Sequence, residues 1–219
     1  CNSILATRAA LTHADYVVTE AGFGAELGGE KFLDIKCRKA GLSPDCIVLV
    51  VTARSLKFNG GVPKEHASEE NVEALKRGFS NVKRHLNTLK RFGSRVVVAI
   101  NRFAADTDAE LEALTTLCRE CGAEAVLTEG FAKGGEGART LARKVAEMCA
   151  LENNGVNYAY ADDDPVRAKI AAVAQGVYGA ADVTYSPLAL EHLAKIESNP
   201  EYAHFPVCIA TVSYTHLTL

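Results

Sequence analysis

The chain has 219 residues, of which 48% are hydrophobic and 23% are charged, and its formal net charge is −3. This length and composition are typical of a globular protein with room for one sizeable domain or one and a half small ones. The small net charge argues against a nucleic-acid-binding surface, and no apolar run is long enough to span a membrane.

Short apolar runs alternate with longer helical patterns, which is typical of a parallel sheet covered by helices. The runs at residues 46–52 and 95–101 are nearly continuous in Ile, Val and Leu, as expected for strands buried on both faces. We therefore predict an α/β fold with a mostly parallel sheet flanked by helices and a helical C-terminal portion. Strands are predicted at residues 16–19, 46–52, 95–101, 124–128 and 205–210.

The helical patterns lie between and after these runs. Apolar residues at spacings of three and four make one seam along the longest, residues 69–92, and basic residues lie off that seam. Ser68 is the predicted N-cap. The basic residues are interpreted as a solvated face, with an anion-binding surface as the alternative. Helices are predicted at residues 3–13, 29–40, 69–92, 108–121, 136–150, 165–178 and 187–198.

A polar, turn-rich segment at residues 153–164 is the clearest break in the pattern. We predict a sheet domain at residues 1–152. Residues 153–210 are then a connection and a helical portion that returns to a strand.

The cysteines and histidines give no metal or redox motif. The seven cysteines are odd in number and irregularly spaced, without a secretory signal, which predicts reduced thiols in a cytoplasmic protein. Cys118 and Cys121 form a lone C-x-x-C, whereas a structural zinc site needs a second pair and a redox pair opens a helix. We interpret both as small apolar residues near a helix end, and we predict no metal site.

The loops expected after the first four strands share an unusual composition of glycine, an aromatic ring and a basic residue. Ligands of an open parallel sheet bind outside the carboxyl ends of its strands. Glycine allows close approach to the backbone, basic side chains suit anions, and phenylalanine offers a stacking face. The pattern predicts a ligand that is planar at one end and anionic at the other. The alternative is that these phenylalanines are core residues under the loops.

Neither of two nucleotide-binding motifs is complete in this sequence. Gly22-x-Gly24-x-x-x-Gly28 resembles a dinucleotide fingerprint, but the next predicted strand ends in Thr52 and Arg54 rather than in the acidic residue that would hold a ribose. The phosphate-loop pattern G-x-x-x-x-G-K-[ST] does not occur in the 219 residues. The chain therefore shows no complete ATP site of its own.

Three segments carry a family resemblance. Residues 51–61 read V-T-A-R-S-L-K-F-N-G-G and closely resemble the signature of the formate–tetrahydrofolate ligase family, and residues 14–38 and 132–137 resemble two further hallmarks of it. The resemblance covers about residues 1–210. It implies a cytoplasmic, ATP-dependent ligase that forms 10-formyltetrahydrofolate from formate and tetrahydrofolate through formyl phosphate. It also implies Mg²⁺ with the ATP, a monovalent cation, a homotetramer and a fold like that of the phosphate-loop NTPases.

The resemblance also implies a folate site. In the family a Phe and a Trp sandwich the pterin ring, and these positions hold Phe103 and Phe131. Leu127 falls on a position that lines the same pocket, and Phe23 falls on an aromatic residue near the active centre.

Lys57 and Arg54 are the best basic candidates for a catalytic role in this chain. A structural alternative for Arg54 is an ion pair with a loop carboxylate such as Glu20.

This sequence lacks parts of the family pattern, and their absence changes the function that we expect of it. The family's phosphate loop falls before the position of Cys1, and the resemblance stops at Ala210, so that residues 211–219 are predicted to be a non-native tail. We expect a piece of the ligase that is inactive alone. The alternatives are a non-catalytic remnant that binds folate or another subunit, and a relative of the phosphate-loop NTPases, which the absence of the loop disfavours.

Overall fold

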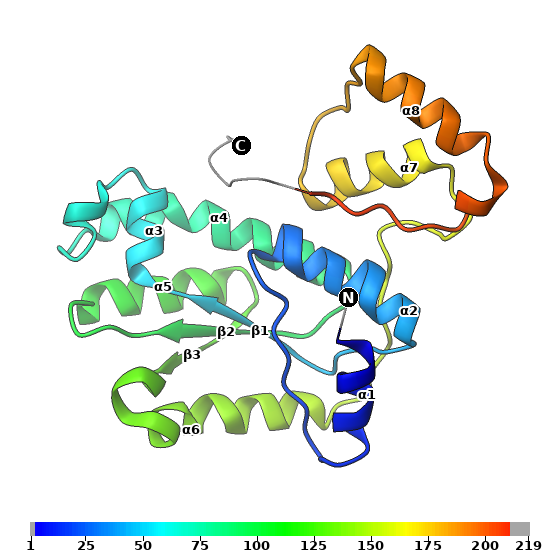
Figure 1. Ribbon diagram of the computed structural model, residues 1–219. Coiled ribbons are helices and arrows are strands. Elements are labelled where there is room, and N and C mark those ends of the chain that lie inside the picture. Colours follow the sequence, from blue (N-terminus) through cyan, green and yellow to red (C-terminus); the bar gives the residue numbers. More distant parts are fainter. Residues whose placement is uncertain (1–2, 211–219) are drawn as a thin grey trace. The chain divides into compact units, whose positions relative to one another are not determined.

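A computed structural model describes residues 3–210, which form two compact units (Figure 1). Residues 43–157 make the first, here called the sheet unit, and residues 3–42 with 158–210 make the second, the helical unit. The predicted boundary at residues 152/153 lies near the second passage of the chain between the units. Residues 3–42, by contrast, belong to the helical unit and not to the sheet. The predicted tail, residues 211–219, lies outside the described residues.

Three parallel strands form the sheet, in the order β1 (Ile47–Val51), β2 (Val96–Asn101) and β3 (Glu124–Thr128). Val51 is level with Ile100, and Ile100 with Leu127, so the carboxyl ends of the strands lie at one edge. The predicted α/β fold with a parallel sheet flanked by helices is confirmed.

Two predicted strands are wrong. Residues 16–19 are irregular, and Tyr16 and Val18 are 61% and 93% exposed, because a short apolar run without a neighbouring strand has nothing to pair with. Residues 205–210 are also not a strand. There the backbone bonds to side chains: the carbonyl of Phe205 accepts from Lys169, and the N–H of Val207 donates to the hydroxyl of Tyr160.

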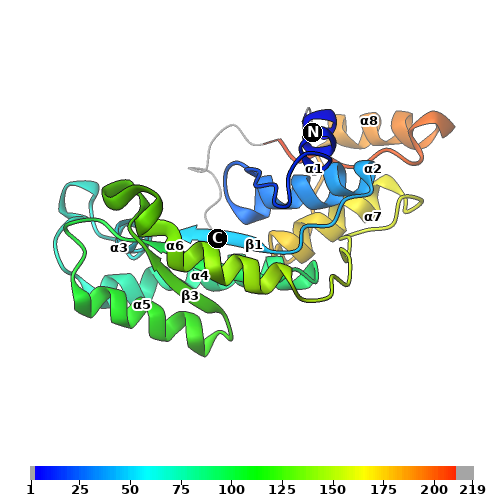
Figure 2. The same ribbon diagram turned by 90° about the horizontal axis from the view of Figure 1, so that it is seen from below.

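Helices cover both faces of this sheet. The first face carries α3 (Ala53–Asn59), α4 (Val72–Arg91) and α5 (Asp108–Glu120), and the opposite face carries α6 (Gly130–Cys149) (Figures 1 and 2). A short 3₁₀ turn, η3 (Lys64–His66), follows α3. The apolar core lies between the first three helices and the strands. It consists of Val51, Ala53, Leu56, Leu75, Phe79, Val82, Leu86, Val98, Ile100, Leu111, Leu114, Cys118 and Ala123.

Helix α4 buries its predicted apolar seam and exposes its basic face. Its N-cap is Asn71, whose side-chain oxygen accepts from the N–H of Ala74 at 2.9 Å, so the prediction of Ser68 as the cap is wrong. Glycine allows α3 and α4 to cross closely. A Cβ on Gly78 would lie 1.9 Å from the carbonyl oxygen of Leu56, a distance that excludes every other residue.

The helical unit contains α1 (Ile4–Leu11), then the π-helices η1 (Ala25–Gly29) and η2 (Lys31–Cys37), continued by α2 (Arg38–Ala40). It resumes with α7 (Val166–Ala171), the π-helix η4 (Ala172–Val177), α8 (Pro187–Glu197) and the 3₁₀ turn η5 (Pro200–Tyr202). The predicted helix 29–40 therefore begins four residues early, at Ala25, and is mostly π-helical. Across residues 3–210, no helix is both long and apolar enough to cross a membrane.

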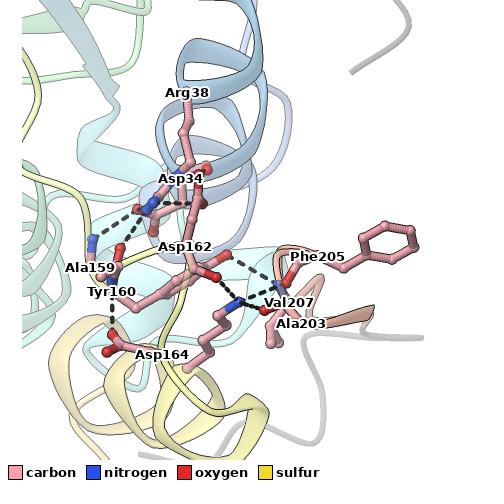
Figure 3. Close-up of polar contacts among 11 residues, drawn as sticks. Asp34, Arg38, Ala159, Tyr160, Asp162, Asp164, Ala203, Phe205 and Val207 are labelled. Atoms are coloured by element: carbon pink, nitrogen blue, oxygen red, sulfur yellow. Dashed lines mark hydrogen bonds and ion pairs between the residues drawn. The ribbon is translucent and has the colours of Figure 1, made fainter. Parts of the chain in front are cut away.

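Two cations, the partly buried Arg38 and the buried Lys169, organise the polar interior of the helical unit. Arg38 donates to the carbonyl of Tyr160 at 2.6 Å and to the carboxylate of Asp162 at 2.9 Å (Figure 3). Its guanidinium also lies over the ring of Tyr158. The ammonium of Lys169, which is 1% exposed, donates to the backbone carbonyls of residues 162, 203 and 205 at 2.5, 3.0 and 3.1 Å. These bonds hold the irregular segments 158–164 and 203–207 in place without a sheet ladder.

A buried ion pair joins the helices of the sheet unit. The ammonium of Lys57 on α3 lies 2.9 Å from the carboxylate of Glu110 on α5, and both side chains have no exposed surface. Lys57 also donates to the carbonyl of Glu69, and Glu110 accepts from the N–H groups of Asn71 and Thr107. Burial alone raises the pKa of Glu110, but these hydrogen bonds and the lysine outweigh it and hold the pKa below its ordinary value.

We expect Glu110→Gln, which leaves the buried ammonium without its counter-charge, to lower the free energy of unfolding by about 3–5 kcal/mol. Urea denaturation followed by circular dichroism measures this loss. Lys76→Met is the matched control, because Lys76 pairs with Glu73 at 2.8 Å on the exposed surface, where such a pair contributes about 0–1 kcal/mol. Equal losses in the two variants would contradict a special role for the buried pair.

Candidate functional site

The site predicted from sequence lies at the carboxyl edge of the sheet, where β1, β2 and β3 end. The chain leaves β2 through Arg102 and Phe103 and leaves β3 through Glu129 and Gly130. The N–H of Arg102 donates to the carbonyl of Thr128 at 3.0 Å, so the two loops begin side by side.

The loop after β2 is a tight turn that presents Phe103. The N–H of Phe103 donates to the carboxylate of Asp106 at 2.8 Å, and the N–H of Asp106 donates back to the carbonyl of Phe103 at 3.1 Å. Asp106 is 7% exposed and Phe103 is 44% exposed. The polar groups of the turn therefore hydrogen-bond within the turn itself, and the aromatic ring is left partly in solvent.

The loop after β3 turns at once into α6 and presents Phe131. The carbonyl of Glu129 accepts from the N–H of Lys133, and the N–H of Glu129 donates to the carbonyl of Gly137 at 3.0 Å. Gly134, with φ of 59° and ψ of −142°, bends the first turn away from the rest of the helix. Phe131 is 91% exposed, so its ring is available to a ligand.

Charges gather around this pair of loops. Lys133 lies 2.6 Å from the carboxylate of Glu129, and Arg102 lies 3.2 Å from that of Asp108. The hydrogen bond from Lys133 and, to a lesser extent, the charges of Lys133 and Arg102 lower the pKa of Glu129 below its ordinary value. The carboxylate therefore stays ionised at neutral pH beside two basic side chains.

Leu127, the remaining predicted folate contact of the sheet unit, borders a groove of about 350 Å³ between α5 and the end of β3. Leu127 is 43% exposed, although most of its neighbours in the sheet are buried. Arg102 of the adjacent loop lines the same groove. The lining is Arg102, Asp108, Leu111, Glu112, Thr115, Thr116, Arg119 and Leu127.

The two basic candidates after β1 differ sharply. Lys57 is completely buried in its ion pair with Glu110 and has no open path to a ligand. Arg54, one turn earlier on α3, is exposed, and no hydrogen bond or ion pair joins it to another residue of the sheet unit. Arg54 is therefore the candidate whose charge is accessible.

Phe23 belongs to the helical unit and is described by itself. Its ring is 84% exposed, and its φ of 55° follows a φ of 48° at Gly22. A left-handed conformation in a bulky residue is strained by about 1–2 kcal/mol, and such strain clusters at functional sites. The conformation agrees with a ligand-binding role without assigning the ligand.

Sequence reasoning missed the residues that shape the site without facing it. Asp106 fixes the Phe103 turn, and the ion pair of Glu129 with Lys133 fixes the Phe131 turn. The available signals were the Asp three residues after Phe103 and the Lys four residues after Glu129, which are spacings of local hydrogen bonds.

Neither a metal cluster nor a reactive thiol accompanies the site in the described part of the chain. No group of three or more His, Cys, Asp or Glu residues within 3–210 is arranged to hold a metal ion. Cys118 is buried on α5 and Cys121 caps the end of that helix, and both are free thiols. Burial raises the pKa of Cys118 to about 12, which makes it unreactive at neutral pH.

Comparisons with known proteins agree with one another. The family model of formate–tetrahydrofolate ligase matches residues 1–218, a span that includes most of the predicted tail. Curated formate–tetrahydrofolate ligases of Parabacteroides distasonis, Sinorhizobium medicae and Methylobacterium radiotolerans are 49%, 48% and 48% identical to the chain and cover 98–100% of it. The chain spans 38–39% of the length of these relatives. It therefore belongs to the formate–tetrahydrofolate ligase family.

Proposed function

We propose that this chain carries the pterin-side loops of an ATP-dependent ligase that forms 10-formyltetrahydrofolate from formate and tetrahydrofolate through formyl phosphate. Family membership supports the reaction class and the substrates. The observation that carries the folate role is the exposure of Phe103, Leu127 and Phe131 around the carboxyl ends of two adjacent strands. Three apolar side chains left in solvent at a ligand-binding edge are best explained by a ligand that buries them.

The two rings suit a flat, reduced pterin. Aromatic faces contribute about 0.5–1.5 kcal/mol beyond the burial of their area when they stack at the right separation. Phe131 stands where the resemblance implies Trp, so it offers a smaller face and no indole donor. We therefore propose weaker pterin binding, by about 1 kcal/mol, than a Trp would provide.

The exposed Leu127 and the groove beside it support a contact for the substrate next to the ring. Arg102 on the rim of the groove supplies a positive charge toward an anionic part of the folate. The role of this chain is thus to hold tetrahydrofolate while its amine attacks the carbonyl carbon of formyl phosphate and inorganic phosphate leaves.

Three further residues take parts in the proposal. Arg54 is proposed to contact an anionic substrate, because its guanidinium is exposed and unpaired within the sheet unit. Lys57 is proposed as a positioning residue that fixes α3, since its ammonium is committed to Glu110. Phe23 is proposed as an additional aromatic contact.

The nucleotide and the ions are proposed for the whole enzyme, a cytoplasmic homotetramer that uses ATP, Mg²⁺ and a monovalent cation. The residues present do not fit a nucleotide site: the chain lacks the phosphate-loop pattern, and residues 3–210 offer no cluster of metal ligands. No step of the reaction is therefore assigned to those groups through residues of this chain.

A chimera tests the folate role. The chain replaces the corresponding part of the Parabacteroides distasonis ligase, to which it is 49% identical over 218 residues. We expect an active enzyme in which Phe131→Ala raises the KM for tetrahydrofolate roughly tenfold and leaves the KM values for formate and ATP unchanged, because only the pterin loses its stacking face.

Two variants sharpen this test. Phe131→Trp is expected to lower the KM for tetrahydrofolate about fivefold, in proportion to about 1 kcal/mol of added stacking. Phe58→Ala is the matched control, because Phe58 is 57% exposed in the same unit but lies outside the proposed pocket. If Phe58→Ala and Phe131→Ala change the KM equally, the folate assignment of Phe131 is wrong.

We expect the isolated 219-residue chain to produce no 10-formyltetrahydrofolate from formate, tetrahydrofolate and ATP, because its sequence contains no phosphate loop. The measurement is the formation of the formylated product, with the active chimera as positive control. Detectable turnover would overturn this expectation. An inactive but folded chimera, together with folate binding by the isolated chain, would favour the non-catalytic remnant instead.

A further inference from the structure

A row of buried acidic side chains lies in the helical unit. Glu26, Glu30 and Asp34 follow one another at four-residue spacing on η1, η2 and the residue between them. Their exposed fractions are 9%, 0% and 0%. This spacing brings successive side chains to the same face of the helix, so the carboxyl groups are neighbours inside the protein.

The carboxylate of Asp34 has a hydrogen-bond donor and a nearby positive charge, whereas the carboxyl group of Glu30 has no donor among the described residues. One carboxylate oxygen of Asp34 accepts from the N–H of Ala159 at 2.8 Å and lies 3.6 Å from the guanidinium of Arg38 (Figure 3). Neither carboxyl oxygen of Glu30 accepts a hydrogen bond from a donor in the described structure, and the side chain lies against that of Asp34. An ionised carboxylate in this position would be desolvated beside a second negative charge, which is strongly unfavourable.

The charged and titratable groups around Glu30 do not supply the missing counter-charge. On its own helix, Lys31 attracts the carboxylate only weakly, and Asp34 repels it more strongly. From the segment 158–164, Tyr160 faces both acids as a neutral phenol, since burial raises its pKa to about 12. Asp162, from the same segment, shares the guanidinium of Arg38.

The remaining cations nearby are occupied. The ammonium of Lys36 donates to the hydroxyls of Ser3, at 2.7 Å, and of Thr7, at 3.0 Å, at the start and within α1. Lys169 of α7 is bound to three backbone carbonyls. A proton is therefore the simplest positive charge that satisfies the pair.

We propose that Glu30 and Asp34 share one proton in the folded protein, and that this buried carboxyl pair is a pH-sensitive clamp on the π-helical segment 25–37. The protonated carboxyl of Glu30 becomes a donor toward Asp34 and satisfies oxygens of both residues. Burial, followed by the charge of Asp34, raises the pKa of Glu30 to about 8, which agrees with this geometry. The clamp is independent of the folate assignment.

The sign of the pH dependence follows from the direction of this shift. Glu30 has an ordinary pKa of 4.5 and titrates at about 8 in the folded chain, so the folded state holds a proton that the unfolded state has lost. Its contribution to stability is complete below pH 4.5 and is lost as the pH rises toward 8. Within that window, the equilibrium constant for folding of the helical unit falls about tenfold for each pH unit.

Hydrogen exchange of the 219-residue chain tests the clamp locally. The readout is the protection of peptides covering residues 24–40 between pH 5.5 and 8.5, corrected for intrinsic exchange rates. Glu30→Gln keeps the shape and a donor toward Asp34 but cannot ionise. We expect the protection of the wild type to fall about tenfold per pH unit relative to that of Glu30→Gln, until the difference levels off above pH 8.

Glu73→Gln is the matched control, because Glu73 is an exposed carboxylate of the sheet unit and its pKa is lowered by Lys76, so that it does not titrate in this range. Parallel pH profiles of the wild type and Glu30→Gln would overturn the proposal. A profile of the wild type that KCl or MgCl₂ flattens at pH 8 would also overturn it, since a metal cation would then be the occupant.

A second measurement keeps the proposal testable if Glu30→Gln does not fold. The ¹³C chemical shift of the Glu30 carboxyl carbon, followed by NMR in the wild-type chain, reports its protonation directly. A midpoint near pH 8 supports the shared proton, and a midpoint near the ordinary value of 4.5 excludes it.

Discussion

A buried charge needs a partner, and the sheet unit satisfies this need with a single ion pair on which its helical layer depends. Lys57 and Glu110 come from α3 and α5, and both also bind the backbone just before α4. Because removing one charge leaves the other unpaired in the interior, the three helices are held to the arrangement that joins them. These helices cover one face of the sheet, so the positions of the strands, and of the loops at their ends, follow from the same contact.

In the loops at the carboxyl edge, hydrogen-bonded turns hold exposed aromatic side chains in place. Phe103 and Phe131 stand on turns whose polar groups are satisfied internally, by Asp106 in one case and by Glu129 with Lys133 in the other. Phe131 contributes little to the folded state, since it is 91% exposed, and Phe103, which is 44% exposed, still leaves part of its surface in solvent. Stability is thus provided beneath the loops, and the aromatic faces are left for the proposed ligand.

The sequence predicted the parts of the fold that local pattern determines. Apolar runs identified all three strands of the sheet, although only β2 is buried along most of its length, and Val50 of β1 is 63% exposed. The same reasoning failed at residues 16–19 and 205–210, since an apolar run predicts an extended chain but not a partner strand. For site residues, Lys57 shows what the sequence cannot predict. Its place in a family signature suggested a catalytic role, and only the tertiary contact with Glu110 reveals that its ammonium is buried. The Thr107–Glu110 capping box was a visible signal for α5, but it did not indicate the lysine.

Each unit buries a glutamate, and the two glutamates are stabilised in opposite protonation states. Glu110 has a lysine and backbone donors, so its pKa is lowered and its contribution is lost as the pH falls below the ordinary range of a carboxyl group. Burial and, after it, the charge of the neighbouring Asp34 raise the pKa of Glu30 to about 8, so its contribution is lost as the pH rises. A fall in pH below the ordinary range of a carboxyl group therefore weakens the sheet unit through Glu110, and a rise in pH from 4.5 toward 8 weakens the helical unit through Glu30. A chain that contains both devices is held most firmly at mildly acidic pH, where the first carboxylate is charged and the second still carries its proton.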